Sequence, residues 1–294
     1  MATLSQWVEG ARPRTLPAAV APVLVGTGAA YALDRANGAF ALLALLVSLA
    51  LQVGVNYAND YSDGIRGTDQ ERVGPVRLVG QGLANPDNVK LAAVLSFAGA
   101  ALFGLALVAL SGAFVLLLVG AAAIAAAWYY TGGKRPYGYS GLGEVFVFVF
   151  FGLVATLGTT YTQAGSVSPE SVAGAVGVGA IASAILVANN LRDIPSDRSH
   201  GKQTLAVRLG EAQTRALYAA LLTVALACVL VAGFIHPSAL VALLSFALAF
   251  PLVQRVLRGA LGRDLVPVLS GTGLFELVYA ALLSLGLGAA QHLG

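Results

Sequence analysis

Long runs of apolar residues dominate the chain, and shorter polar segments separate them. Nine windows are apolar over the ~20 residues that a membrane-spanning helix needs. They lie at 15–33, 39–57, 89–110, 112–131, 143–162, 171–190, 213–233, 237–254 and 268–289. This pattern predicts an all-α polytopic membrane protein, in which nine transmembrane helices form a bundle with a polar cap on its cytoplasmic side.

The positions of the basic residues predict the orientation of this bundle. The N-terminus and every second connection together hold every Lys and Arg of the chain except Arg35. Basic residues concentrate on the cytoplasmic side of membrane proteins. The sequence therefore predicts a cytoplasmic N-terminus, an external C-terminus and cytoplasmic loops at 58–88, 132–142 and 191–212. We expect a multi-pass protein of the cell membrane.

Composition excludes several classes of function. Of the 294 residues, 57% are hydrophobic and 11% are charged, whereas a soluble domain carries about 25% charged residues. The single cysteine, Cys228, excludes a disulfide framework and a cysteine-based metal site. The net charge of +3 follows from the topological bias and does not indicate nucleic-acid binding. The segment with Trp7, Arg12 and Arg14 is expected to be an anchor helix on the membrane surface.

The first of two acidic clusters follows the second apolar window, in the sequence NYANDYSDGIRGTD. Asn56, Asp60 and Asp63 fall at i, i+4 and i+7, which places them on one face of a continuing helix. Together with Asn59 and Asp69 they offer hard oxygen ligands. Mg²⁺ prefers such ligands and commonly bridges carboxylates to substrate phosphates. The alternative interpretation is a solvated loop at the membrane surface.

The pattern returns after the sixth apolar window, in the sequence NNLRDIPSDRSHGKQTLAVRLG. Asn189, Asp193 and Asp197 repeat every four residues, and Asn190 adds a second amide. Two facing carboxylate pairs could hold Mg²⁺ on a diphosphate and neutralise the charge that develops on it as a leaving group. Pro195 lies between the two acids, so we expect the helix to be interrupted before Asp197.

Several side chains near the clusters or in neighbouring loops are candidate diphosphate ligands. They are Arg66, Arg77, Tyr130, Lys134, Arg198 and Lys202. Surface ion pairing is the alternative for the basic residues and contributes little to stability. Phosphate capture would instead use strong, charge-assisted hydrogen bonds.

Two further acids lie within or at the ends of apolar windows. Glu144 begins a window, where the positive end of the helix dipole stabilises a carboxylate without any function. Glu276 lies deeper and is expected to pair with a buried polar group. The abundant Gly and Ala of the helices are expected to allow close packing. No P-loop, dinucleotide fingerprint, HExxH sequence or nucleophile elbow is visible.

We therefore expect one domain over residues 1–294, made of two weakly related halves with acidic segments at 56–82 and 189–210. A metal–diphosphate site would lie at the cytoplasmic mouth of the bundle. The apolar helices could shelter a lipid tail and keep water away from a carbocation. A transporter is the alternative from another class, but it would need polar residues along several helices and access from both sides.

The motifs resemble those of the UbiA superfamily of intramembrane aromatic prenyltransferases, and the resemblance covers most of the chain. It rests on NDYSD at 59–63, YTGGK at 130–134 and RDIPSD at 192–197. A narrower resemblance is to the branch of this superfamily that prenylates 1,4-dihydroxy-2-naphthoate in menaquinone biosynthesis. It rests on the sequences ARPRTLPAAVAPVLVGT, GPVR and NNLRDIPSDRSHGKQTLAVRLG. The superfamily's general first motif places its third acid where this chain has Gly67, and the next acid is Asp69.

The resemblance implies a Mg²⁺-dependent enzyme that transfers a polyprenyl group from polyprenyl diphosphate to 1,4-dihydroxy-2-naphthoate, with decarboxylation to demethylmenaquinone. It implies that the metal is held by Asp60, Asp63, Asp193 and Asp197. It implies diphosphate binding by Asn56, Asn59, Arg66, Arg77, Tyr130, Lys134, Asn190, Arg198 and Lys202. A different acceptor (4-hydroxybenzoate, homogentisate or haem) is the alternative within the same fold. Membrane lipid is an expected partner, whereas nucleic acid and an obligatory protein partner are not.

Overall fold

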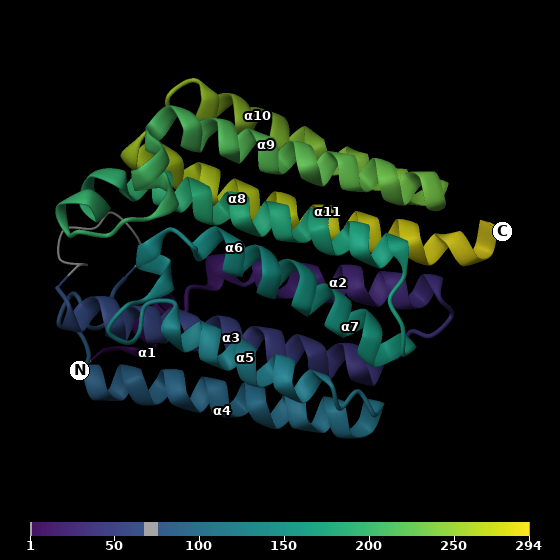
Figure 1. Ribbon diagram of the computed structural model, residues 1–294, viewed down its shortest axis with the longest axis horizontal. Helices are drawn as coiled ribbons and strands as arrows, with labels where there is room; N and C mark the ends of the chain where they lie inside the picture. Colours follow the sequence, from purple (N-terminus) through teal and green to yellow (C-terminus); the bar gives the residue numbers. More distant parts are fainter. Residues whose placement is uncertain (1, 68–75, 294) are drawn as a thin grey trace.

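Antiparallel helices run along the length of the molecule in the computed structural model of the chain (Figure 1). The structure describes residues 2–67 and 76–293. Its helices are α1 (Leu4–Gly10), η1 (Pro13–Thr15), α2 (Pro17–Ala32), α3 (Gly38–Ile65), α4 (Pro86–Ser111), α5 (Leu116–Tyr129), η2 (Tyr137–Ser140), α6 (Gly143–Val147), η3 (Phe148–Val154), α7 (Ala155–Ala164), α8 (Pro169–Ser199), α9 (Leu205–Ile235), η4 (Pro237–Ser245), α10 (Phe246–Leu257), η5 (Gly262–Leu265) and α11 (Val266–Leu293).

Every predicted apolar window contains helix, which confirms the all-α class. Among the described residues, seven helical segments are long and apolar enough to cross a membrane. The pair Leu4–Thr15 and Pro17–Ala32, bent by 47°, adds an eighth if it counts as one span. The helix α5 has only 14 residues. The chain is therefore an integral membrane protein with seven or eight candidate spans by length and composition.

Two of the predicted polar loops begin as helix. The expected loops at 58–88 and 191–212 begin inside α3 and α8, because these helices continue to Ile65 and Ser199. Contrary to expectation, α8 is not interrupted at Pro195. The acids on both sides of this proline are buried, and tertiary packing supplies most of the stability of a helix in a protein. The loss of one backbone hydrogen bond is therefore tolerated there.

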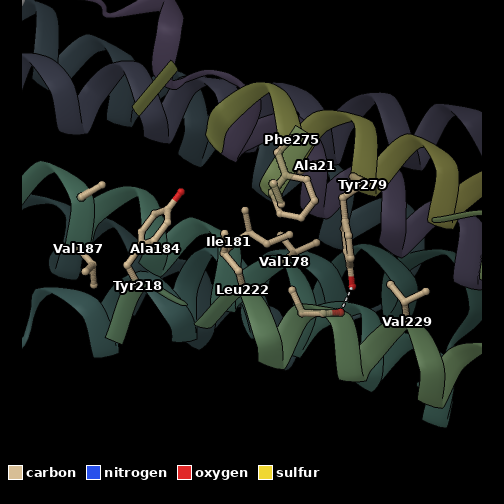
Figure 2. Close-up of a cluster of buried hydrophobic side chains, with 14 of the residues drawn as sticks. Ala21, Val178, Ile181, Ala184, Val187, Tyr218, Leu222, Val229, Phe275 and Tyr279 are labelled. Carbon is tan, nitrogen blue, oxygen red and sulfur yellow. Dashed lines mark hydrogen bonds between the residues drawn. The ribbon is translucent and has the colours of Figure 1, made fainter. Parts of the chain in front are cut away.

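The helix α8 is the centre of the bundle, since 78% of its most apolar window is buried inside the protein. Its inward residues, among them Val178 and Ile181, pack against Leu222 of α9 and Phe275 of α11 (Figure 2). Glu276 is completely buried. Neither of its carboxyl oxygens has a hydrogen-bond partner among the described residues, so the expected pairing is wrong.

Glycines allow the helices to approach closely, as the sequence predicts. A Cβ atom built on Gly152 would lie 2.5 Å from the Cα of Gly179, and one built on Gly179 would lie 3.0 Å from the Cα of Gly152. Gly152 belongs to the π-helical turn η3. The two backbones are therefore in direct contact where η3 crosses α8.

The connections that carry the polar motifs meet at one end of the bundle, at the left in Figure 1. The chain returns there between α3 and α4, between α5 and α6, and between α8 and α9. The last turns of α11 lie at the opposite end (Figure 1). The helices that bring these connections together thereby place the two acidic clusters side by side.

Substitution of Gly152 tests the contact between η3 and α8. Gly152→Ala is expected to destabilise the protein by about 1–3 kcal/mol, because the new methyl group overpacks two backbones. Gly99→Ala is the matched control, since a Cβ at Gly99 meets nothing within 4 Å. Thermal unfolding in detergent measures both variants, and equal midpoints would contradict the assigned contact.

Candidate active site

A cavity of about 1660 Å³ lies inside the bundle, larger than the roughly 300–1,000 Å³ of a typical small-ligand site. Polar residues line the end where the three connections meet, and residues such as Leu105, Val119 and Phe151 line the remainder. The polar lining includes Arg12, Gln52, Asn56, Asn59, Asp63, Arg77, Tyr130, Thr131, Tyr139, Asn189, Asn190, Arg192, Asp197 and Lys202. The space therefore suits an amphipathic ligand with a polar head and a long apolar part.

A buried ion pair joins the two acidic clusters. Nζ of Lys202 lies 3.4 Å from Oδ2 of Asp63, and both side chains are buried. The hydroxyl of Tyr139 donates a hydrogen bond of 2.6 Å to the other oxygen of Asp63. Lys202 also lies 4.5 Å from the centre of the Tyr139 ring, within reach of a cation–π interaction. One carboxylate of α3 is thus contacted from both of the other polar connections.

The second cluster approaches the same place from α8. Asp197 is buried and lines the cavity. The hydroxyl of Thr204 lies 3.5 Å from Oδ2 of Asp197, and the backbone N–H of Lys202 donates to the carbonyl of Asp197. These contacts fold the short α8–α9 connection back over the end of α8, which directs Lys202 toward Asp63.

Asp60 is engaged by the chain that returns from the first acidic segment. Its two oxygens accept hydrogen bonds from the backbone N–H groups of Leu78, at 2.7 Å, and Val79, at 3.1 Å. It is completely buried and is not part of the cavity lining. The neighbouring residue Arg77 is buried and does line the cavity. Asp60 therefore fixes the segment that carries this arginine.

Asp193 is likewise held by neighbouring side chains. Arg192 donates to both of its oxygens at 2.7 Å and also donates to Oδ1 of Asn189 at 2.9 Å. Arg192 and Asn189 line the cavity, whereas Asp193 does not. In this arrangement Asp193 orients a guanidinium group that faces the cavity.

The amides of the first cluster connect α3 to neighbouring segments. Nδ2 of Asn56 donates to the carbonyl of Ala11 at 2.8 Å and to the hydroxyl of Thr15 at 3.0 Å. Oδ1 of Asn59 accepts a hydrogen bond of 2.8 Å from Thr131. Each amide thus holds one segment of the wall in place.

The remaining predicted cations are placed differently from Lys202 and Arg77. Arg66, Lys134 and Arg198 are exposed and are not part of the cavity lining. Arg66 donates hydrogen bonds to the carbonyls of Thr131 and Gly133 instead. Asp69 lies outside the described residues. Diphosphate binding by the exposed cations stays a prediction from the sequence.

The oxygen donors of the cavity fit Mg²⁺. Among the described residues, no three His, Cys, Asp or Glu side chains converge on one point. Mg²⁺ does not require such a cluster, because it usually keeps several waters and binds through one or two carboxylates plus substrate phosphates. Asp63 and Asp197, with the amide of Asn59, supply oxygen donors of this kind in one cavity.

Aromatic side chains form a continuous wall below the polar end of the cavity. Tyr130 meets Tyr137 edge-on at 5.5 Å, Tyr137 stacks on Phe146 at 3.9 Å, and Phe146 stacks on Phe150 at 6.1 Å. All four line the cavity, and we call them the aromatic wall. Burial raises the pKa of Tyr137. Its phenol therefore stays protonated and donates to the carbonyl of Ala126.

Sequence reasoning missed Tyr139 and Arg192 as residues of the site. Tyr139 lies in the PYGY sequence, five residues after the predicted Lys134, and Arg192 lies between the predicted Asn190 and Asp193. The only sequence signal for these two residues was their position inside the motifs. The direction in which each side chain points depends on the tight turns of the two connections, and residue spacing does not predict that direction.

Comparison with known proteins places this helical membrane bundle among the intramembrane transferases. Residues 19–264 match the UbiA prenyltransferase family, and the chain belongs to this family. A 1,4-dihydroxy-2-naphthoate octaprenyltransferase of Mycobacterium tuberculosis is 56% identical over 99% of both chains. A protein of the same description from Escherichia coli is 40% identical over 95% of this chain and 92% of its own length.

A solved structure supports the fold independently of close sequence identity. It is described as a UbiA homolog from Archaeoglobus fulgidus bound to DMAPP and Mg²⁺. The two proteins are 14% identical, and the alignment covers 97% of this chain and 99% of that chain with a TM-score of 0.62. This likeness shows a shared fold.

Removal of the Asp60 charge tests its role in holding the returning segment. Asp60→Asn keeps one acceptor oxygen for two backbone donors, so the expected cost is about 1–3 kcal/mol of stability. Amide hydrogen exchange at Leu78 and Val79 should become faster. Asp87→Asn, at an exposed aspartate, is the matched control. Unchanged exchange together with an altered Mg²⁺ requirement would instead assign Asp60 to the metal.

Proposed function

We propose that this chain transfers a polyprenyl group from polyprenyl diphosphate to 1,4-dihydroxy-2-naphthoate, with loss of the carboxylate as CO₂, to give the hydroquinone form of demethylmenaquinone. One observation carries this proposal: buried Asp63, Asp197 and Lys202 line the same end of a large, otherwise apolar cavity. The two octaprenyltransferases named above, similar over nearly their whole lengths, support this choice of acceptor.

Mg²⁺ is the proposed cofactor, held by Asp63 and Asp197 together with the diphosphate oxygens. When bound, it neutralises charge on the diphosphate and so makes it a better leaving group. The archaeal UbiA homolog bound to DMAPP and Mg²⁺ supports this assignment. The ligand roles of Asp60 and Asp193 stay predictions from the sequence, since Asp60 bonds the backbone of the segment that carries Arg77, and Asp193 bonds Arg192.

Positive and amide side chains of the polar end bind the diphosphate in this proposal. Lys202, Arg77 and Arg192 are buried cations of the lining, and charge-assisted hydrogen bonds to phosphate are strong in such surroundings. Asn56, Asn59 and Tyr130 complete the polar end. The exposed Arg66, Lys134 and Arg198 would meet the diphosphate as it enters.

The apolar part of the cavity then protects the reaction. The bond between the allylic carbon and the diphosphate oxygen breaks, and its electron pair leaves with the diphosphate. The faces of the aromatic wall stabilise the allylic cation, and the dry surroundings prevent its capture by water. The electron-rich ring forms the new carbon–carbon bond, and departure of CO₂ returns an electron pair to the ring.

The same proposal includes the arrangement in the cell membrane. Nine crossings, a cytoplasmic N-terminus and an external C-terminus place the polar end of the cavity at the cytoplasmic face, where a soluble aromatic acid is available. The positions of the basic residues support this orientation. We also infer two weakly related halves, because Asp63 and Asp197 each lie at the last turns of a long helix.

An activity assay with purified protein tests the reaction. Polyprenyl diphosphate and 1,4-dihydroxy-2-naphthoate are expected to give a prenylated naphthohydroquinone and CO₂ only when Mg²⁺ is present, and air oxidation then converts the hydroquinone to the quinone for detection. Asp63→Asn and Asp197→Asn are each expected to lower kcat by roughly 100-fold or more, since loss of a metal ligand removes several kcal/mol of charge stabilisation. Liquid chromatography and released CO₂ measure the products.

Asp87→Asn serves as the control for a surface aspartate in this assay. Turnover of 4-hydroxybenzoate or homogentisate in place of the naphthoate would keep the site and contradict the acceptor. Absence of turnover with every acceptor, in protein shown to be folded, would contradict prenyl transfer.

Cysteine labelling tests the proposed orientation. The chain has one cysteine, Cys228, which is buried and can be replaced by Ala. In that background Gln81→Cys and Ser166→Cys place single thiols at exposed positions in two connections. In intact cells a membrane-impermeant maleimide is expected to label position 166 and not position 81. Labelling of position 81 and not of position 166 would show that the orientation is the reverse of the proposed one. Equal labelling of both positions would contradict the proposed number of membrane crossings between them.

A further inference from the structure

A buried glutamate at the start of α6 has no part in the reaction proposed above, yet it lies directly behind the cavity wall. Glu144 is 7% exposed, and its Oε1 accepts a hydrogen bond of 2.9 Å from Nδ2 of Asn190. Its backbone carbonyl accepts a second bond from Ser183, so α6 and α8 are joined twice. Oε2 of Glu144 is buried and has no hydrogen-bond partner among the described residues.

This contact determines which end of the Asn190 amide faces the cavity. Asn190 lines the cavity, whereas Glu144 does not. A carboxylate oxygen is a hydrogen-bond acceptor, so it holds Nδ2 on the side of Glu144 and leaves Oδ1 for the cavity. Within the described part of the chain, no group donates a hydrogen bond to that Oδ1.

The position of Asn190 along α8 favours a ligand other than the diphosphate. Asn190 precedes Asp197 by seven residues, which corresponds to ~10 Å along a helix axis. It therefore lies deeper than the carboxylates that we assign to the metal. A carbonyl oxygen and a phosphate oxygen are both acceptors and repel each other, while a hydroxyl group is a donor that complements Oδ1.

A surface suited to a flat aromatic ring lies next to Oδ1 of Asn190. The residue before Glu144, Gly143, lies against the first ring of the aromatic wall, since a Cβ built there would be 3.4 Å from Cε2 of Tyr130. The same Cβ would be 3.1 Å from Leu186, which also lines the cavity. Aromatic rings attract one another in offset-stacked and edge-to-face arrangements. A hydroxyl acceptor and a ring-binding surface are therefore adjacent.

We propose that Glu144 is the positioning residue of the acceptor subsite: it holds Nδ2 of Asn190, so that Oδ1 of Asn190 accepts a hydrogen bond from a ring hydroxyl of the aromatic acceptor. Glu144 acts through Asn190 and does not touch the substrate. The inference rests on the proposed function, because it concerns the acceptor of that reaction. It assigns Asn190 to the acceptor instead of the diphosphate.

Steady-state kinetics with two Glu144 variants give the first test. Glu144→Leu removes the acceptor that orients Asn190 and is expected to raise KM for 1,4-dihydroxy-2-naphthoate about tenfold, as the loss of one hydrogen bond does. The KM for polyprenyl diphosphate and the half-saturating Mg²⁺ concentration should stay within about twofold. Glu144→Gln keeps an oxygen that accepts from Nδ2 and should restore KM to within about threefold of the original protein.

Equilibrium dialysis without prenyl diphosphate separates positioning from a general structural effect. The probes are 1,4-dihydroxy-2-naphthoate and the two naphthoates that each lack one ring hydroxyl. The original protein should bind one of these analogues about tenfold more weakly than the parent, and Glu144→Leu should bind that analogue as well as the original protein does. Asn190→Ala should lose the same affinity for 1,4-dihydroxy-2-naphthoate as Glu144→Leu does. The variant with both substitutions should lose no more affinity than either single variant, as expected for coupled residues.

Glu170→Leu is the matched control, because Glu170 is another buried glutamate and is not part of the cavity lining. Equal affinity of Glu144→Leu and the original protein for all three naphthoates would overturn this inference alone. A change confined to Mg²⁺ or prenyl diphosphate would also overturn it and return Asn190 to the diphosphate. If Glu144→Leu does not fold, Asn190→Ala decides by the same binding measurements. Failure of the original protein to bind or prenylate the naphthoate would overturn both this inference and the proposed function.

Discussion

The polar end of the cavity depends on the buried ion pair between Lys202 and Asp63. These residues are 139 positions apart in the sequence, and each would be costly to bury alone. Their contact fixes the end of α3 relative to the α8–α9 connection. Tyr139 donates to the same carboxylate and adds the connection between α5 and α6. Three segments that are separate in the sequence thus meet at the side chain of Asp63, and together they form the polar end of the cavity.

Hydrogen bonds to carboxylates of the clusters extend this arrangement outward. Asp60 holds the backbone that carries Arg77, and Asp193 holds Arg192. Acids that a motif groups together therefore divide into those that face the cavity and those that position its cations. An acid that faces away can still be essential, because the guanidinium it orients would otherwise lose its place.

Periodicity alone was sufficient for the fold class, because each predicted apolar window contains helix in the part of the chain that the structure describes. It was insufficient for the ends of the helices. The polar residues beyond residue 57 in α3 and beyond residue 190 in α8 find hydrogen-bond partners in the neighbouring connections or on their own helix, and a hydropathy window does not detect such contacts. The i, i+4, i+7 spacing correctly grouped Asn56, Asp60 and Asp63 on a helix. It did not indicate which of them reaches the cavity, since that depends on the path of the returning segment.

The direct contact between Gly152 and Gly179 has a consequence for how this protein can change. A side chain at either position meets the backbone of the other helix, and neither partner has an atom to give up in compensation. A larger side chain at one of these positions cannot be compensated by a smaller one at the other, because both residues are already glycine. Single substitutions where η3 crosses α8 are therefore unfavourable. Variation in the shape of the cavity is confined to its neighbours, such as Phe150, Phe151 and Val154 on the same turn. Those positions are where selection or design has freedom to adapt the cavity to a different chain length.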